Sequence, residues 1–225
     1  GVNQPAVASS SLTIRGQSLH PQINEERLQE LENHQPLVRS KPQVRIGETR
    51  ITPDNVEENE ISLELSSVST EEKNSLRAGI QSLQIVYSIA PKRVESEPER
   101  IVGSNVMPFV LCPTIAEVEV EDLEDNGDET YSAKMQVRID LTVAVEQRAL
   151  IFLNERSTSN PAAYIFEAAP RRRNSTLITF PIRDVKEGDY LVRVQIDGAE
   201  SPLNVDVNSE SETYEQFVSP AVTIG

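Results

Sequence analysis

The stretch Gly188–Ile196 (GDYLVRVQI) decides the fold class. A glycine turn leads into a strand in which the apolar side chains of Tyr190 and Ile196 point to one face, whereas Arg193 points to the other. Such alternation is typical of a strand with one face in a core and one face in solvent. Residues Gly79–Val86 (GIQSLQIV) repeat this character. Half-buried β-strands are therefore the predicted building block.

Further short strands are predicted on both sides of this stretch, at intervals of roughly 8–15 residues. They are residues 12–14, 44–46, 61–65, 80–87, 106–111, 115–120, 135–145, 149–153, 163–166, 177–182, 190–196 and 217–224. The one predicted helix is Ile23–Leu31, which has apolar residues at helical spacing and is followed by Pro36. This pattern predicts an all-β fold of immunoglobulin-like β-sandwiches.

A weak internal repeat predicts two domains. Phe109–Ile115 (FVLCPTI) parallels Phe217–Ile224 (FVSPAVTI), and the two phenylalanines lie 108 positions apart. An immunoglobulin-like sandwich has roughly 100 residues, so this spacing is typical of a duplicated domain. We expect a linker at residues 1–11, one sandwich with the short helix at 12–113, and a second sandwich at 114–225.

The charge balance and the distribution of apolar residues disfavour nucleic acids and the membrane interior as partners. The 225 residues include 21 Lys and Arg against 36 Asp and Glu, a formal net charge of −15. Binding to nucleic-acid phosphates needs a basic surface, so no nucleic-acid partner is expected. No apolar run approaches roughly 18 residues and no signal segment opens the chain, so no direct membrane insertion is expected. The start at Gly1 suggests a processed chain or a fragment of a longer one.

Few residues are available for nucleophilic or metal chemistry. The chain has one cysteine, Cys112, and two histidines, His20 and His34. Cys112 ends a strand pattern and is expected to be buried and structural, because reactive thiols need an electropositive neighbourhood. No glycine-rich phosphate loop and no serine nucleophile elbow is found. We expect no catalytic residues, no cofactor and no enzyme.

The acidic run Glu121–Glu129 (EDLEDNGDE) is the candidate metal site. Calcium prefers several oxygen ligands, and a loop of carboxylates around a glycine can supply them. The EF-hand spacing does not fit, however, and Asn126-Gly127 is a strong hairpin turn signal. A solvated, charged hairpin is favoured over a calcium loop, and no metal is predicted.

Arg171, Arg172 and Arg173 form the one concentrated basic patch, in a loop after Pro170. Such a patch can dock on an acidic partner surface, including another copy of this acidic chain. A plain exposed loop is the alternative. Asn174–Thr176 fits a glycosylation tripeptide, a pattern that is frequent by chance.

Four stretches together resemble one bacterial family. They are Ile51–Val56 (ITPDNV), Leu76–Val86 (LRAGIQSLQIV), Gly103–Ile115 (GSNVMPFVLCPTI) and Tyr190–Leu203 (YLVRVQIDGAESPL). Over roughly residues 40–225 the chain is similar to the C-terminal immunoglobulin-like tandem of tail-terminator, or cap, proteins. These proteins belong to contractile injection systems of the Photorhabdus virulence cassette type.

The resemblance implies a non-enzymatic structural component of a phage-tail-like particle, part of the cap at the distal end of the sheath and tube. It implies sheath, tube and other cap subunits as partners, and a homo-oligomer, a hexamer in the family. The particle would lie in the bacterial cytoplasm, be associated with a membrane, or be released. The terminator domain that precedes the tandem in the family has no counterpart in residues 1–225.

Two other functions stay open from the residues themselves. A surface-exposed, adhesin-like module that binds a ligand or carbohydrate would need an exposed aromatic strip or bound calcium. Aromatic residues make up only 4% of the chain, which disfavours this alternative. An enzyme ranks third.

Overall fold

The computed structural model describes residues 5–17, 19, 37–39, 41–91, 100–157 and 159–225. The chain divides into two compact units, here called unit 1 and unit 2. Unit 1 comprises Gly1–Ala8, Arg77–Ile80 and Val110–Gly225, and unit 2 comprises Ser9–Leu76 and Gln81–Phe109. The predicted all-β fold with a tandem of antiparallel sandwiches and a short helix is confirmed. The particular helix predicted at 23–31, like His20 and His34, lies outside the described residues.

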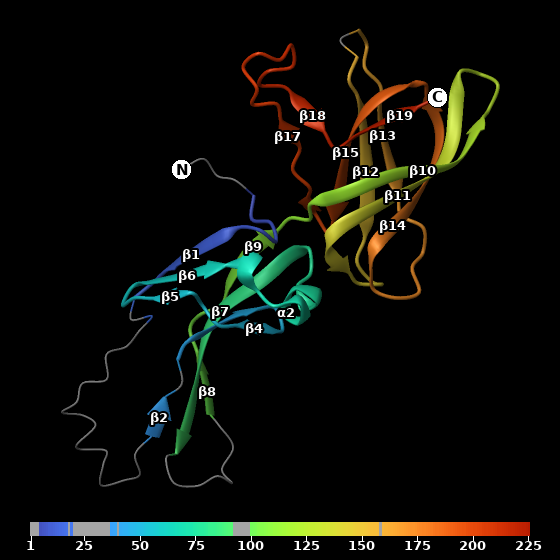
Figure 1. Cartoon of the computed structure of the whole chain (residues 1–225). Coiled ribbons are helices and arrows are strands. Elements are labelled where there is room, and N and C mark those ends of the chain that lie inside the picture. Colours follow the sequence, from blue (N-terminus) through green and yellow to red (C-terminus); the bar gives the residue numbers. More distant parts are fainter. Residues whose placement is uncertain (1–4, 18, 20–36, 40, 92–99, 158) are drawn as a thin grey trace. The chain divides into compact units, whose positions relative to one another are not determined.

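Two antiparallel sheets of unit 1 form the layers of a sandwich, and two further strands form a separate two-stranded sheet (Figure 1). The strands of unit 1 are β10 (Ile115–Asp125), β11 (Thr130–Val143), β12 (Ala149–Glu155), β13 (Ala163–Glu167), β14 (Ser175–Lys186), β15 (Gly188–Ile196), β16 (Ala199–Glu200), β17 (Asn204–Val205), β18 (Phe217–Ser219) and β19 (Ala221–Ile224). One layer has the order β10-β11-β14. The other layer has the order β13-β12-β15, with β16 and β19 both pairing with β15, and the separate sheet consists of β17 and β18. This division of consecutive strands between two sheets is typical of immunoglobulin-like sandwiches.

The core of unit 1 follows from the alternation in the sequence. On β11, Met135 and Val137 are fully buried, whereas Arg138 on the opposite face is exposed. On β15, Val192 and Val194 are fully buried in the same way. Each strand therefore contributes one apolar face to the space between the two sheets.

A tyrosine fixes the corner where β14 passes into β15. Tyr190 is fully buried, and its Oη donates a hydrogen bond of 2.9 Å to the carbonyl of Lys186, four residues earlier. The ring of Tyr164 meets it edge-on at 6.0 Å between centroids, and Tyr164 Oη accepts from the Lys186 N–H at 3.3 Å. Burial raises the pKa of the Tyr190 phenol above its usual range. This is the tyrosine corner of immunoglobulin-like sandwiches.

Unit 2 is built on two further antiparallel sheets. Its strands are β1 (Ser11–Arg15), β2 (Leu37–Arg39), β3 (Gln43–Ile46), β4 (Thr49–Ile51), β5 (Asn55–Val56), β6 (Glu60–Glu64), and the larger parts of β7 (Gly79–Pro91), β8 (Arg100–Gly103) and β9 (Met107–Leu111). The orders are β1-β6-β5 and β2-β7-β3-β4, with β8 and β9 also pairing with β7. On β3, β4 and β6 alternate residues are buried, among them Ile61, Leu63, Val44 and Ile46.

The described helix of unit 2 lies at a place for which no helix was predicted. α2 spans Thr70–Ser75 and follows a 3₁₀ turn, η2 (Leu65–Ser67). Ser69 caps it: its hydroxyl accepts from the Glu72 N–H at 3.3 Å, and the Glu72 carboxylate accepts from the Ser69 N–H at 3.0 Å. This reciprocal capping box appears in the sequence as Ser69-x-x-Glu72, a recognisable signal for the start of a helix.

The strand predicted over residues 217–224 is wrong as one continuous element. It is divided into β18, which pairs with β17, and β19, which pairs with β15. Pro220 lies between them, and proline has no N–H to donate to a neighbouring strand. Its carbonyl accepts instead from the Val192 N–H at 2.9 Å.

Candidate functional site

Two β-bulges lie on either side of the same point of β11. In β10, Asp122–Leu123 stand opposite Ala133 alone, and in β14, Arg183–Asp184 stand opposite Ser132 alone. The first bulge has Asp122 at φ 50° and the second has Asp184 at φ 53°. Aspartate tolerates this left-handed region better than most residues. Bulges re-aim side chains, so this end of the sheet departs from simple alternation.

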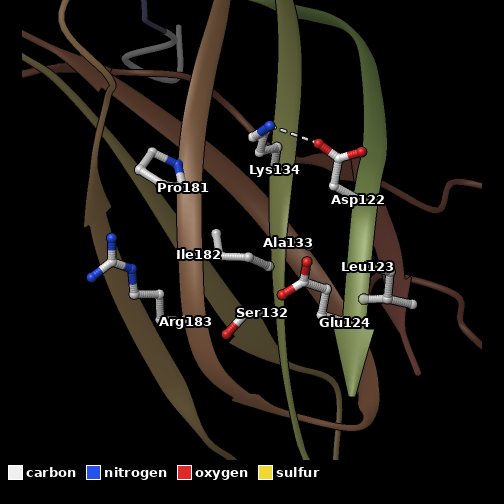
Figure 2. A pocket seen from close by; sticks show the side chains of 9 residues that line it. All are labelled: Asp122, Leu123, Glu124, Ser132, Ala133, Lys134, Pro181, Ile182 and Arg183. Carbon is white, nitrogen blue, oxygen red and sulfur yellow. Dashed lines mark hydrogen bonds and ion pairs between the residues drawn. The ribbon is translucent and has the colours of Figure 1, made fainter. Parts of the chain in front are cut away.

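The two bulges frame an open groove of about 580 Å³ across β10, β11 and β14 (Figure 2). Nine described residues line it: Asp122, Leu123, Glu124, Ser132, Ala133, Lys134, Pro181, Ile182 and Arg183. Lys134 Nζ lies 2.7 Å from Asp122 Oδ2, and this carboxylate raises the pKa of Lys134. Both side chains are more than half exposed, so solvent screens the pair and it contributes little to stability. The lining offers charges of both signs and, among these nine residues, no aromatic surface.

The acidic run 121–129 forms the hairpin favoured by its sequence, between β10 and β11. Asn126 N–H donates to the Thr130 carbonyl at 3.0 Å, and Gly127 adopts φ 81°. Asp125 accepts from the Gly127 N–H at 2.7 Å, and Asp128 accepts from the Thr130 hydroxyl at 2.5 Å. These two carboxylates stabilise the turn itself. Within the described residues, no group of three His, Cys, Asp or Glu side chains is placed to hold a metal ion.

The three arginines of the basic patch have different surroundings. Arg171 is half-buried, and its guanidinium Nη2 donates to the carbonyls of Ala144, at 3.1 Å, and Gln147. It therefore links its own loop to the turn between β11 and β12. Of the three arginines, only Arg172 and Arg173 have exposed side chains.

Cys112 is buried, as predicted. It is 7% exposed, and burial raises the pKa of its thiol. Its N–H donates to the carbonyl of Ala6 at 2.7 Å, next to an isolated bridge between Ala6 and Leu111. A protonated, buried thiol is a poor nucleophile, so this residue acts as a small apolar side chain.

Several exposed apolar side chains of unit 1 lie on a segment to which the sequence pattern assigned no functional role. Residues 204–219, which we call the β17–β18 arm, leave the sandwich after β16 and return at β19 (Figure 1). Four of its apolar side chains are strongly exposed: Val205 (43%), Val207 (84%), Tyr214 (44%) and Phe217 (54%). Val205 and Phe217 are facing partners in the β17–β18 pair, and exposed apolar side chains that lie together are typical of protein contact sites.

Asp206 gives the arm a defined internal structure. Its carboxylate accepts from the Thr213 hydroxyl at 2.6 Å and from the Asn208 N–H at 2.9 Å. Hydrogen bonds to the carboxylate from Ser211 and Thr213 lower the pKa of Asp206. The backbone of Asp206 also pairs with Gln216 and Glu215, at 2.9 and 2.8 Å. The exposed side chains are thus presented by an ordered loop.

The arm also carries charge of one sign. It contains four carboxylates and no Lys or Arg: the acids are Asp206, Glu210, Glu212 and Glu215. A matching partner surface would be basic around an apolar pocket. A sequence signal was available, because large apolar residues stand in a polar, acidic stretch that shows no helical or strand periodicity.

The comparison with known families concerns unit 1. Residues 113–223 match the model of a family described as Domain of unknown function (DUF8756). The matched range includes β10 to β18 and most of β19. No curated protein matches the chain. None of the helices in the described ranges has the length and apolar character of a membrane span.

Proposed function

We propose that this chain is a non-enzymatic structural component of a phage-tail-like contractile injection system, where it forms part of the cap at the distal end of the sheath and tube. The observation that carries the proposal is the β17–β18 arm. Its exposed side chains, above all Val207 and Phe217, give unit 1 a surface suited to protein contact.

The resemblance of four stretches to cap-protein tandems narrows the class of partner. Sheath proteins, tube proteins and other cap subunits are the proposed partners, and the chain is proposed to work as a homo-oligomer, a hexamer by resemblance. A cap ends polymerisation when it covers the unpaired interface of the last ring. The exposed apolar and acidic arm supports this role because it can add to the buried area of an interface. A stable interface buries roughly 800 Å² per partner. The proposed location is the bacterial cytoplasm within an assembled particle, with membrane association or release as later states.

The test combines this chain with the sheath and tube proteins of a contractile injection system and images the particles by electron microscopy. The wild-type chain is expected as density at one end of each particle. A double variant, Val207→Ser with Phe217→Ser, should lose that density, because it removes the apolar contact surface of the arm. Both side chains are exposed, so the folded core is untouched and the loss can be assigned to the arm. Val145→Ser is the matched control, since Val145 is also an exposed valine (43%) of unit 1 but lies outside the arm. A wild-type chain that stays free beside intact particles would refute the proposal.

The groove of Figure 2 favours a second candidate, a ligand-binding, adhesin-like module. Lys134 and Arg183 can bind an anionic group, and Asp122 and Glu124 a cationic one. Titration calorimetry with calcium and with a glycan panel tests it, together with Arg183→Ala. Heat that disappears in this variant would support the module, and the absence of heat would remove it.

A further inference from the structure

Three of the edges of the sheets in unit 1 carry features that hinder pairing with another strand. β10 has Glu117, Glu119 and Glu121 on its outer face and is interrupted by a bulge. β14 carries Pro181 and the second bulge. At the far side of the other sheet, β16 has two residues and β19 begins directly after a proline. Glutamates, prolines, bulges and short strands are the usual protections of a sheet edge.

Among the edges of the two layers, β13 (Ala163–Glu167) has the fewest of these protections. In the described structure it pairs with β12 alone, and its register runs without a shift. Its sequence, AYIFE, has no Lys, Pro or Gly, and Ile165 at its centre is 62% exposed. Its one charge, Glu167, forms an ion pair with Arg148 at 3.1 Å.

The hydrogen-bond phase shows which backbone groups of β13 face outward. Glu155 N–H donates to the Ala162 carbonyl at 2.9 Å, and Ala168 N–H donates to the Ala149 carbonyl at 3.0 Å. Facing residues of an antiparallel pair alternate between hydrogen-bonded and non-hydrogen-bonded pairs, so the even-numbered residues of this stretch bond to β12. The odd-numbered residues Ala163, Ile165 and Glu167 therefore direct their N–H and C=O groups away from β12, toward the open edge.

We infer that β13 pairs with β13 of a second copy of this chain, antiparallel and about a two-fold axis at Ile165. The register is self-complementary: Ile165 faces Ile165 of the second copy, and Ala163 faces Glu167 in both directions. All three outward residues then form hydrogen-bonded pairs. No two glutamates face each other in this register, so the one charge on the strand does not oppose it.

The side chains beside this axis are apolar. Ile165 stands opposite Phe152 of β12 and on the same face, and the Arg193 guanidinium lies over the Phe152 ring at 5.6 Å. Pairing would bury both copies of Ile165 next to these rings. A single five-residue strand covers less than the roughly 800 Å² per partner of a stable complex, so the association is reversible and concentration-dependent.

This inference goes beyond the proposed function and does not need it. A two-fold contact joins two copies and closes, whereas a ring of six subunits needs a head-to-tail contact through two different surfaces. The pairing can therefore exist with or without a contractile particle.

Sedimentation velocity over a concentration series of the full chain tests the pairing. Ile165→Lys should weaken dimerisation by about tenfold or more, because two ammonium groups then face each other. Ala163→Pro should weaken it without any charge, because it removes an outward N–H that β12 does not use. Ala221→Lys, an equal charge change at an exposed residue on the opposite edge of the same sheet, should leave it unchanged. Since each copy has a net charge of −15, added salt should strengthen the dimer by screening.

A cross-link fixes the register. Facing residues of a hydrogen-bonded antiparallel pair have Cα atoms about 5.5 Å apart, within the range of a disulfide. Ile165→Cys should therefore form a disulfide-linked dimer under mild oxidation, whereas Ala221→Cys and the wild-type chain, whose Cys112 is buried, should not. A wild-type chain that is monomeric up to about 1 mM would overturn the inference. So would a dimer that persists at wild-type strength in both Ile165→Lys and Ala163→Pro.

Discussion

The hydroxyl of Tyr190 should stabilise unit 1 by an amount that can be measured. Tyr190→Phe removes one oxygen, leaves the buried ring in place, and deprives the Lys186 carbonyl of a donor at 2.9 Å. A lost hydrogen bond that leaves a partner unsatisfied costs about 1–2 kcal/mol. The free energy of unfolding of unit 1 should fall by this amount.

Hydrogen exchange followed by mass spectrometry can separate the two units. Slowly exchanging amides of β11, β12 and β15 should exchange about 5–30-fold faster in Tyr190→Phe, because their protection reports the stability of unit 1. Amides of β3 and β6 in unit 2 should change little. Tyr164→Phe is the matched control: its hydroxyl accepts a longer bond of 3.3 Å, so its loss should cost less than about 0.5 kcal/mol.

Two results would refute this reasoning. Exchange in β15 that is unchanged by Tyr190→Phe would show that the corner hydrogen bond contributes nothing net. An equal effect of Tyr164→Phe would show that any hydroxyl in this cluster matters alike, and that the geometry of the corner is not the cause.

Three other predictions concern side chains of unit 1. Burial raises the pKa of Tyr190 in the folded state above the value of about 10 for an unfolded tyrosine. The neutral phenol therefore stabilises unit 1 fully below about pH 10, and this stability is lost as the pH rises further. Urea unfolding from pH 8 to 11 should show a steeper loss of stability in wild type than in Tyr190→Phe. Arg171→Ala should destabilise unit 1 by about 1–3 kcal/mol, because two carbonyls lose a charged donor, whereas Arg172→Ala and Arg173→Ala should stay within about 0.5 kcal/mol in the same unfolding assay. Equal effects of the three would contradict the distinct role of Arg171. The thiol of Cys112 should react with a disulfide reagent many times more slowly in the native chain than in urea, and fast native labelling would show that it is not buried as described.

The sequence predicts the fold class well where burial alone decides the pattern. Gly188–Ile196 alternates because one face of β15 lies in a core. Gly79–Val86 follows the predicted pattern only in part, since Ile80 is 70% exposed and the neighbours Ile85 and Val86 are both buried. The hairpin at Asn126-Gly127 was recognised because its turn chemistry is local. Cys112 was placed correctly because it continues an apolar strand.

Other features depend on interactions that a single pattern does not contain. The bulges at Asp122 and Asp184 arise from the pairing of three strands, and neither residue is the glycine that usually marks a left-handed position. Arg171 seemed equivalent to its two neighbours, because only the folded chain brings the carbonyls of the β11–β12 turn to it. The start of α2 was missed although Ser69 and Glu72 encode it, since a helix of six residues has too little periodicity to stand out.

The manner in which the β17–β18 arm is closed has a consequence for how its length and sequence can change. Asn204 Nδ2 lies 3.0 Å from Ser219 Oγ, so the two ends of the arm meet before the chain re-enters the sandwich. The free-energy cost of closing such a loop, which is entropic, rises only slowly with length, by about 0.6 kcal/mol for each doubling. The tip between these ends can therefore be lengthened, shortened or exchanged while the core around Val192 and Val194 stays the same. The sandwich acts as a constant frame, and the arm, our proposed contact element, is an insert that can be transplanted into another sandwich of the same strand order.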